Sequence, residues 1–459
     1  MSSSGSKNDS QSSSSSGMNL PIENSSSLSS TQVANNSDIL TQILLCLPVK
    51  SLLIFKSVSK NWFSLISDSY FAKNYTLRNS SFKIPGLFIE ILRRPSGPPD
   101  DPEFEFPFVF LINNEHSNTV GGGVPLKTLD FVEVPPRNWE GPIIETSLRI
   151  NHSCNGLLCC TRITAQTSKQ PCLVTYHIYV YNPTTKQSKS FPPSPFRDIV
   201  TDRLWNGVRS VSLAFDPVKA PDHYQVICIW KDLGEIEPDL YNIEIYSTKT
   251  NSWRLSAASP FSTLPLSFSR PGVFWHSFFR SGVFWNGCLH WISTGENEAS
   301  VYFDIEQDLV KPLPLPDVPN DDVWVFTYIG DCRNHLYLVG FLESCPRDYN
   351  IFEMETDYSG WNLIYKLDLE RIINAYPEMV LHFNTVEYHM LVLFLGEAEE
   401  KSSKKLVLLI NAAQVISYDL KEMAYKEIYH FDPKTRFTMS RGSGTRGYVH
   451  QYIESLACV

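Results

Sequence analysis

A repeated strand pattern restricts the possible folds of this chain more than any other feature of its 459 residues. From about residue 82 onward, short runs rich in Val, Ile, Tyr, Phe and Trp alternate with Pro, Asn, Asp, Ser and Gly, which is typical of strands and turns. In five of these runs an aromatic residue precedes a turn residue, and another apolar or aromatic strand follows the turn. These aromatic residues stand roughly 50 to 65 positions apart and are Tyr181, Tyr246, Phe303, Phe352 and Tyr418.

Each repeat holds four predicted strands. Another strand pair precedes the aromatic hairpin, as in residues 211–217 with 224–229, or within residues 282–292. Four strands per unit, repeated along the chain, are typical of the blades of a β-propeller. Residues 84–150 contain further strand-like runs, so the sequence predicts six blades. One short helix is predicted within residues 367–375.

The chain before residue 82 divides into two parts by composition. Residues 1–36 are rich in Ser, Asn and Gln, and their few apolar side chains cannot offset the entropy of ordering, so a disordered leader is predicted. From Ser37 and Asp38, either of which can cap a helix, apolar residues recur with helical spacing. The sequence predicts three short helices: one over residues 39–46, one over 49–57 with Pro48 at its start, and one capped by Ser59.

These short helices carry more apolar surface than so small a unit can bury by itself. The first helix is apolar around more than one face, because Ile39, Leu40, Ile43 and Leu44 all belong to it. Two interpretations are open from the residues alone. The helices are either a cap that packs on the rest of this chain, or a docking surface for the helices of a partner.

Residues 37–71 closely resemble the F-box of the large plant F-box families. The resemblance rests on Leu-Pro-Val-Lys-Ser-Leu at 47–52, Phe-Lys-Ser-Val-Ser-Lys-x-Trp at 55–62 and Leu-Ile-Ser-Asp-x-x-Phe at 65–71. Asn36 and Ser37 stand where the family often has Leu-Pro at the start of the motif.

Residues 82–459 resemble the F-box-associated domains of plant F-box proteins, which are related to kelch repeats. Matching stretches include Tyr-Asn-Pro-Thr-Thr at 181–185 and Phe-Trp-Asn-Gly-x-Leu-His-Trp at 284–291. True kelch blades carry a Gly-Gly doublet, whereas here Gly-Gly-Gly at 121–123 lies in an apparent loop and the blades show at most single glycines. The two resemblances together imply a multidomain α+β protein. Its expected parts are a disordered leader (1–36), a three-helix F-box (37–80) and a mostly-β propeller (82–459).

In this family the F-box binds the Skp-type adaptor of cullin-RING ubiquitin ligases. The resemblance therefore implies a non-catalytic substrate-recognition subunit of an SCF-type E3 ubiquitin ligase, whose propeller binds a target protein for ubiquitination. Buried aliphatic and aromatic anchors would supply most of the affinity for the adaptor. Carried over by position, the adaptor-binding residues are Ile39, Leu40, Ile43, Leu44, Leu47, Pro48, Leu52, Leu53, Val58, Trp62, Leu65 and Ile66.

Loops of the propeller form the predicted target-binding surface. Gly-Val-Phe-Trp occurs at 272–275 and again at 282–285, which fits two neighbouring strands or an exposed Trp275. Because aromatic side chains often anchor interfaces, the candidate target-binding residues are Trp275, His276 and Trp324. The candidate loops are residues 93–103, 197–206, 267–280 and 317–323.

Charge and hydropathy argue against two classes of partner. The chain has 49 Asp and Glu against 39 Lys and Arg, and its formal charge of −10 disfavours nucleic-acid phosphates and anionic lipids. No stretch approaches the roughly 18 to 20 apolar residues of a membrane span, and the N-terminus lacks the layout of a secretory signal. We therefore expect an intracellular protein, cytoplasmic and/or nuclear, that binds neither nucleic acid nor membrane.

The residues that could support catalysis or hold a cofactor form no coherent pattern. The ten cysteines show no CxxC and are predicted to be reduced core thiols, and the 11 histidines show no HxxxH, so no metal is expected. His152, His290 and His335 are predicted to be hydrogen-bonded structural residues. A literal GxGxxG at 442–447 follows no apolar strand, so no dinucleotide cofactor is expected either.

Four aspartates recur at predicted strand ends, namely Asp216, Asp304, Asp331 and Asp419. They could converge as the carboxylate pair of a glycosidase, but their recurrence across the repeats favours a role in turns. Two alternatives to the ligase subunit are therefore kept. One is a propeller lectin or enzyme to which the helices are incidental, and the other is an F-box scaffold that binds the adaptor without ubiquitin transfer.

Overall fold

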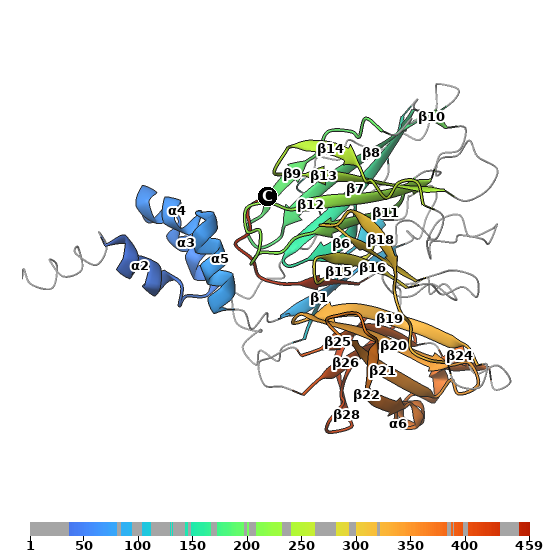
Figure 1. Ribbon diagram of the computed structural model, residues 1–459. Helices are drawn as coiled ribbons and strands as arrows, with labels where there is room; N and C mark the ends of the chain where they lie inside the picture. Colours follow the sequence, from blue (N-terminus) through green and yellow to red (C-terminus); the bar gives the residue numbers. More distant parts are fainter. Residues whose placement is uncertain are drawn as a thin grey trace, which may run out of the picture. The chain divides into compact units, whose positions relative to one another are not determined.

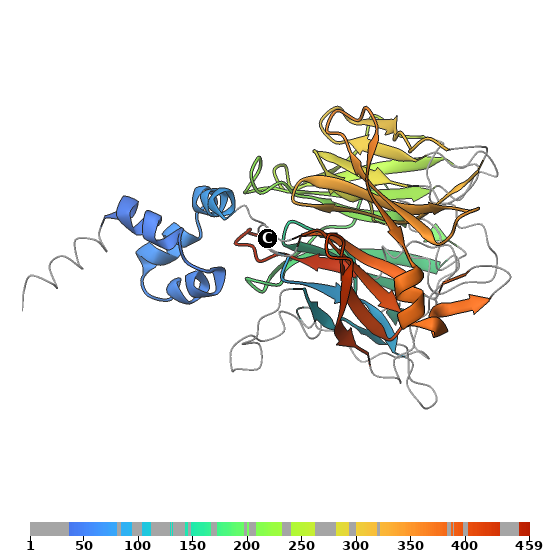
Figure 2. The same cartoon turned by 90° about the horizontal axis from the view of Figure 1, so that it is seen from below.

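The computed structural model has a short helical segment that precedes a six-bladed β-propeller in the chain (Figures 1 and 2). The chain divides into two compact units between Pro48 and Val49. The structure describes residues 36–79, 84–93, 103–111, 129, 131, 143–145, 148–166, 172–196, 200–201, 208–231, 240–261, 281–292, 300–318, 322–382, 387–388, 390–397, 403–431 and 449–459. Residues 1–35 of the predicted leader and the GxGxxG lie outside these residues.

Between residues 36 and 79, which the structure describes, the chain forms four helices, one more than the three that the sequence predicts. They are α2 (Ser37–Leu44), α3 (Val49–Phe55), α4 (Lys60–Ile66) and α5 (Ser69–Arg78). The additional helix is α5, and Asp68 caps it: one carboxylate oxygen accepts hydrogen bonds from the backbone N–H groups of Tyr70 (2.8 Å) and Phe71 (3.3 Å). Such a cap satisfies donors that the first helical turn leaves unpaired.

The caps of α2 and α4 test two predictions. Ser59 caps α4 as predicted, because its hydroxyl accepts a hydrogen bond from the backbone N–H of Trp62 at 3.2 Å. The prediction for α2 was wrong by a residue or two. Its cap is Asn36, whose side-chain oxygen accepts from the N–H groups of Asp38 (3.1 Å) and Ile39 (3.2 Å), so the helix starts at Ser37.

Six antiparallel sheets form the blades of the propeller, which confirms the predicted blade number. Blade 1 contains β29 (Val449–Tyr452), β1 (Gly86–Ile89) and β4 (Phe108–Phe110). Blade 2 contains β5 (Ile143–Glu145), β6 (Arg149–Cys154), β7 (Leu157–Gln166), β8 (Cys172–Asn182), β9 (Gln187–Ser190) and β10 (Val200–Thr201). Blade 3 contains β11 (Val208–Ala214), β12 (Gln225–Lys231), β13 (Tyr241–Ser247) and β14 (Ser252–Leu255).

Blades 4 to 6 have four strands each, paired in chain order. Blade 4 contains β15 (Val283–Trp285), β16 (Cys288–Trp291), β17 (Val301–Asp304) and β18 (Leu309–Pro312). Blade 5 contains β19 (Trp324–Cys332), β20 (His335–Leu342), β21 (Asp348–Met354) and β22 (Trp361–Asp368). Blade 6 contains β25 (Met390–Gly396), β26 (Lys405–Ile410), β27 (Gln414–Asp419) and β28 (Ala424–His430).

Short elements extend some connections between these strands. They are β2 (Ile91–Arg93) paired with β3 (Glu103–Glu105), α6 (Glu370–Ala375), the 3-10 helix η1 (Pro377–Met379), and β23 (Val380–His382) paired with β24 (Glu387–Tyr388). Helix α6 lies within the predicted range 367–375. Among the described residues, no helix has the length and apolar character needed to cross a membrane.

The aromatic repeat of the sequence is the blade repeat of the structure. The five aromatic residues lie one each on β8, β13, β17, β21 and β27, the third strands of blades 2 to 6. Asx side chains organise the turns that follow several of these strands. Asn182 and Asp419, for example, each accept hydrogen bonds from the two backbone N–H groups two and three positions later.

Strands from both ends of the chain close the propeller. In blade 1, β29 pairs antiparallel with β1, with Gly86 opposite Tyr452 and Ile89 opposite Val449. A side chain at Gly86 would collide with the ring of Phe108 and the carbonyl of Val109, so the close approach of β4 requires glycine here. The sequence pattern placed the sixth blade within residues 84–150 alone. That prediction missed the C-terminal strand, which completes this blade.

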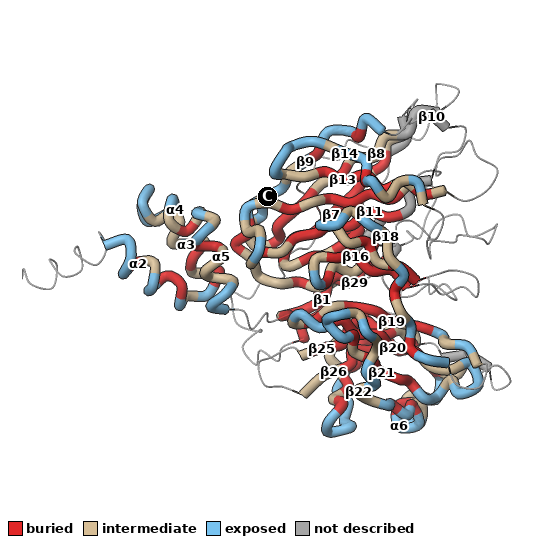
Figure 3. The backbone as a smooth tube through the Cα atoms, viewed as in Figure 1, coloured by how far each residue is buried: buried red, intermediate tan, exposed pale blue. Residues whose placement is uncertain are grey.

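Each pair of neighbouring blades shares an apolar core. Phe88 of blade 1 and Leu158 of blade 2 belong to one cluster, and Ile245 of blade 3 and Phe303 of blade 4 belong to another. Figure 3 shows the resulting bands of buried residues along the strands. The predicted thiols divide between core and surface: Cys154, Cys159, Cys160, Cys228, Cys288 and Cys332 are buried, whereas Cys46, Cys345 and Cys458 are exposed.

Antiparallel pairing gives the propeller two different faces. Connections from the second to the third strand of a blade, and from one blade to the next, end on one face, which we call the loop face. The remaining tight turns and the C-terminal residues after β29 lie on the opposite face. Figure 1 shows β10 and β24 at the loop face, away from the C-terminus. Asn182, at a turn of blade 2, donates hydrogen bonds to the carbonyls of Ser455 (3.1 Å) and Ala457 (2.8 Å) and so fixes the C-terminal residues.

Candidate functional site

Helix α2 exposes one apolar row and buries another. Leu40 and Leu44 are buried, whereas Ile39 and Ile43 are each 46% exposed. Residues four positions apart lie on the same face of a helix, so Ile39 and Ile43 form a continuous exposed apolar row. An exposed row of this kind on a capped helix is suited to contact with another protein.

Helices α3 to α5 and the turn between α3 and α4 expose further large apolar side chains. The ring of Phe55 packs edge-on against Trp62, with 5.4 Å between centroids, and gives this helical segment a small core of its own. Other apolar side chains are not covered. The exposed ones are Ile54 (68%), Val58 (58%), Phe63 (56%), Tyr70 (69%) and Leu77 (46%).

The twelve predicted adaptor-binding residues differ in accessibility. Ile39, Ile43, Pro48 and Val58 are exposed; Leu47, Leu53, Trp62 and Leu65 are half-buried; Leu40, Leu44, Leu52 and Ile66 are buried. The sequence prediction omitted Ile54, Phe63, Tyr70 and Leu77, which are exposed. Helical geometry held a signal for Ile54, because two residues after Leu52 the chain has turned about 200° to the opposite face.

The four candidate target-binding segments join strands whose ends lie at the loop face. Residues 93–103 lie between the second and third strands of blade 1, and the other three segments join one blade to the next. Trp275, His276 and the first Gly-Val-Phe-Trp lie outside the described residues, whereas residues 283–285 form β15. The four segments were predicted separately, and strand topology brings their ends to the same face.

Trp324 lies half-buried at the start of β19. Its indole N–H donates a hydrogen bond to the carbonyl oxygen of Asp317 at 3.1 Å, and its ring packs edge-on against Phe352 at 5.3 Å. The side chain therefore holds the connection between blades 4 and 5 against the sheet, while part of it is still accessible.

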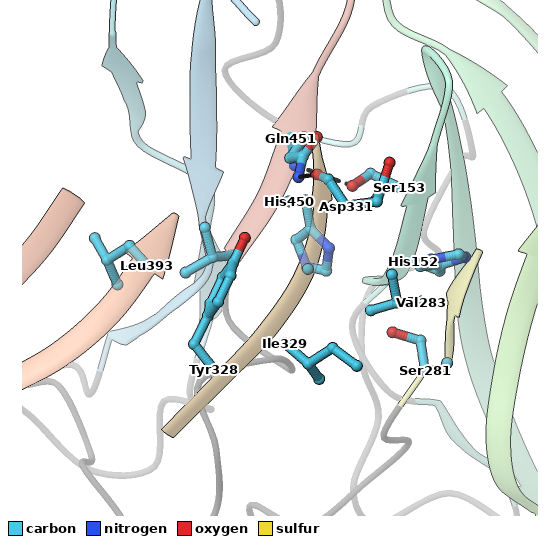
Figure 4. Close-up of a pocket in the computed structure, with 13 residues that line it drawn as sticks. His152, Ser153, Ser281, Val283, Tyr328, Ile329, Asp331, Leu393, His450 and Gln451 are labelled. Carbon is cyan, nitrogen blue, oxygen red and sulfur yellow. Dashed lines mark hydrogen bonds between the residues drawn. The ribbon is translucent and has the colours of Figure 1, made fainter. Parts of the chain in front are cut away.

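A small polar cavity lies among the innermost strands of the propeller (Figure 4). Its lining includes His152, Asp331, His450 and Gln451. Gln451 bridges two blades, because its amide donates to the carbonyl of Asp331 at 2.8 Å while its backbone N–H donates to the Ser153 hydroxyl at 3.0 Å. The cavity volume of about 70 Å³ is well below the roughly 300 to 1,000 Å³ of small-molecule sites.

Burial changes the pKa values of two groups at this cavity. It raises the pKa of Asp331 to about 6. It lowers the pKa of His450 to about 3, with smaller contributions from the positive charges of His152 and Arg149. Shifted pKa values can mark a catalytic site, but desolvation dominates both shifts and the cavity is too small for a substrate.

Three of the four recurring aspartates form turns, as their recurrence favoured. Asp216, Asp304 and Asp419 each accept hydrogen bonds from backbone N–H groups two or three positions later. Asp331 differs, because it lies within the inner strand β19 and faces the cavity. The assumed equivalence of the four positions was therefore wrong: only Asp304 and Asp419 end third strands.

The predicted structural histidines are hydrogen-bonded. The His152 ring accepts from the backbone N–H of Leu213 at 2.9 Å, His290 contacts the Tyr358 hydroxyl at 2.9 Å, and His335 pairs with Glu353 at 2.6 Å. Within the part of the chain that the structure describes, no group of three or more His, Cys, Asp or Glu residues is arranged to hold a metal ion.

Two protein-family models match the chain. A model of the F-box domain matches residues 19–74, and a model of the F-box associated beta propeller domain matches residues 137–332. Three Arabidopsis thaliana proteins show the extent of the similarity. F-box protein At5g07610 is 29% identical over 449 residues, which cover 95% of this chain and 94% of that protein. F-box protein At5g49610 is 25% identical, covering 85% and 90%, and putative F-box/kelch-repeat protein At1g13200 is 25% identical, covering 72% of each.

Proposed function

We propose that this chain, an F-box protein with an F-box domain before an F-box-associated β-propeller domain, is a substrate receptor of an SCF-type ubiquitin ligase. In this proposal the helices bind a Skp-type adaptor, and through it a cullin-RING ligase, inside the cell. The loop face binds the target protein. The chain contributes no catalytic residue, because it acts by raising the effective concentration of a target lysine near the ubiquitin-charged enzyme.

The exposed apolar side chains of α2 to α5 carry this proposal. Seven large apolar side chains between residues 39 and 77 are at least 46% exposed. Each would gain roughly 25 cal/mol for every Å² of apolar surface that a partner removes from water. Such a surface is costly to leave uncovered in solution, and the match to the F-box domain model covers the same residues up to residue 74.

Adaptor binding tests the proposal most directly. Ile43→Asp places a carboxylate in the apolar row of α2, and burying that charge unpaired should weaken binding of a purified Skp-type adaptor by about 100-fold or more. Met423→Asp is the matched control, because Met423 is 48% exposed in a propeller turn and Ile43 is 46% exposed. The full chains are compared by co-purification and by biolayer interferometry. Equal binding of both variants and the unmodified chain would contradict adaptor docking through α2.

Ubiquitin transfer requires a second measurement. Proteins captured by the full chain are added to a reconstituted cullin-RING reaction, with and without the Ile43→Asp substitution. We expect polyubiquitin on a captured protein only when the adaptor is bound. Adaptor binding without any transfer would favour the scaffold alternative.

A further inference from the structure

An exposed apolar patch lies at the described ends of the connection from blade 4 to blade 5. We call it the β18–β19 patch and define it by Leu315, Val318, Val323, Trp324 and Val325. The four aliphatic side chains are 42%, 48%, 42% and 37% exposed in that order. The connection joins one blade to the next, so the patch belongs to the loop face.

Hydrogen bonds hold the backbone of this patch in place. The indole of Trp361 donates to the carbonyl of Pro314 at 2.8 Å, and the indole of Trp324 donates to that of Asp317 at 3.1 Å. On the other side, the N–H of Glu343 donates to the carbonyl of Val323 at 2.9 Å. A surface fixed in this way loses little conformational entropy when a partner binds, so its apolar area converts more fully into affinity.

Acidic residues outnumber basic ones in the chain segments that carry or adjoin the patch. In the described segments 313–318, 322–325 and 342–348, the charged residues are Asp317, Asp322, Glu343, Asp348 and, with the opposite sign, Arg347. Hydrogen bonds from the Ser344 hydroxyl and the Val323 N–H hold the pKa of Asp322 below its usual value, which keeps this carboxylate ionised. The local negative charge has the same sign as the net charge of −10.

We propose that the β18–β19 patch docks a target segment that combines aliphatic side chains with lysine or arginine. This proposal rests on the function proposed above and specifies the class of target that the loop face takes. The aliphatic side chains of the segment cover Leu315, Val318, Val323 and Val325, and its cations lie against the acidic side chains of the adjoining chain segments. An acidic or phosphorylated segment is disfavoured by like charge.

Designed peptides provide the probe, because the natural target is not identified. Fluorescence anisotropy measures binding of the full chain to three short labelled peptides: alternating Val and Lys, alternating Val and Glu, and alternating Ser and Lys. We expect the Val–Lys peptide to bind at least about tenfold more tightly than either other peptide, and to weaken as salt is added. Equal binding of the Val–Lys and Val–Glu peptides would overturn the proposal.

Substitutions assign this binding to the patch. Val318→Ser combined with Val323→Ser should reduce Val–Lys binding about tenfold, whereas Leu309→Ser, at a side chain 48% exposed on β18, should leave it unchanged. Asp317→Lys combined with Glu343→Lys should invert the preference toward the Val–Glu peptide. If Leu309→Ser weakened Val–Lys binding as much as the Val318→Ser and Val323→Ser pair does, the assignment of binding to the patch would be overturned.

Two further readouts distinguish target docking at the patch from a failure of the ligase function and from self-association. Adaptor binding is measured on the same patch variants and should be unchanged. If the unmodified chain binds the adaptor but not the Val–Lys peptide, the patch proposal alone is refuted. If the unmodified chain does not bind the adaptor, the ligase function is refuted.

Sedimentation velocity tests whether a second copy of the chain occupies the patch. A dimer that Val323→Asp converts to monomer would overturn the proposal.

Discussion

The helical segment and the propeller differ in how completely they cover their large apolar side chains. In the propeller, neighbouring blades cover each other, and side chains such as Phe303 and Leu338 are completely buried. In the helical segment, Ile54 and Tyr70 are more than two-thirds exposed. Apolar residues between the blades therefore stabilise the propeller fold, whereas several large apolar side chains of the helical segment remain in contact with water.

The two regions also differ in the range of the interactions that hold them. Asn36, Ser59 and Asp68 cap helices through bonds to residues two or three positions away. The propeller depends on contacts between distant positions. Arg149 of β6, for example, donates to the buried carboxylate of Glu90 at 3.2 Å through Nε and so joins blade 2 to blade 1. Substitutions should accordingly have large effects in the propeller and local effects in the helices.

The largest expected effect is that of Phe303→Ala. Phe303 is fully buried between blades 3 and 4, so its truncation leaves a cavity and should lower the free energy of unfolding of the propeller by about 3 to 5 kcal/mol. Urea denaturation followed by tryptophan fluorescence measures the change. Leu309→Ala, at an exposed position of the same blade, should cost less than about 1 kcal/mol. Equal costs at the two positions would refute the inter-blade core as the main source of stability.

Asp331→Asn should have an intermediate effect that depends on pH. Burial raises the pKa of Asp331 to about 6, above the value of about 3.9 in unfolded chains, so the folded protein holds this proton more tightly. The stability that the protonated group contributes is present below about pH 4 and is lost as pH rises through 6. As pH rises between these values, the free energy of unfolding of the variant should therefore increase relative to that of the unmodified protein. The difference should reach about 1 to 3 kcal/mol at pH 7. Urea denaturation from pH 4 to 7 measures the difference, and a difference that does not change with pH would contradict the assignment.

The smallest expected effect is that of Asp68→Ala in the helical segment. Loss of the carboxylate leaves the N–H groups of Tyr70 and Phe71 unpaired and should destabilise α5 by about 1 kcal/mol. Hydrogen exchange of the α5 amides should then become about fivefold faster, with exchange in the propeller unchanged. Asp68→Asn retains an acceptor and should restore slow exchange. Faster exchange throughout the propeller would show that the two regions are coupled.

Much of the fold follows from local sequence patterns. The features that were not predicted lack such a local pattern. The aromatic repeat located the third strands of blades 2 to 6, and Ser59 was recognised as a cap from its position before an apolar helix. Helix α5 was missed because its apolar residues do not share one helical face: Phe71 is buried, whereas Tyr70 and Leu77 are exposed. The cavity role of Asp331 was missed because its neighbours Gln451 and His152 come from other blades.

The candidate sites were predictable to different degrees. The motif residues of the F-box located the helical segment, but the pattern did not separate exposed Ile43 from buried Leu44. For the propeller, the sequence predicted Trp324 and four loops as parts of a target-binding surface. That the loops end on the same face of the propeller follows from the directions of the strands. The β18–β19 patch combines Leu315 and Val318 with residues 323–325, and hydrogen bonds from Trp324 to Asp317 and from Glu343 to Val323 fix its backbone, so folding assembles it.

The sequence by itself determined the capped helices, the strand repeat and the turns, because hydrogen bonds and side-chain periodicity over a few residues specify each of them. Tertiary structure decided the rest. Pairing of Gly86 with Tyr452 closes the propeller, and burial among inner strands shifts the pKa values of Asp331 and His450. These outcomes depend on which distant segments meet and on how much water they exclude, and no local pattern encodes either quantity.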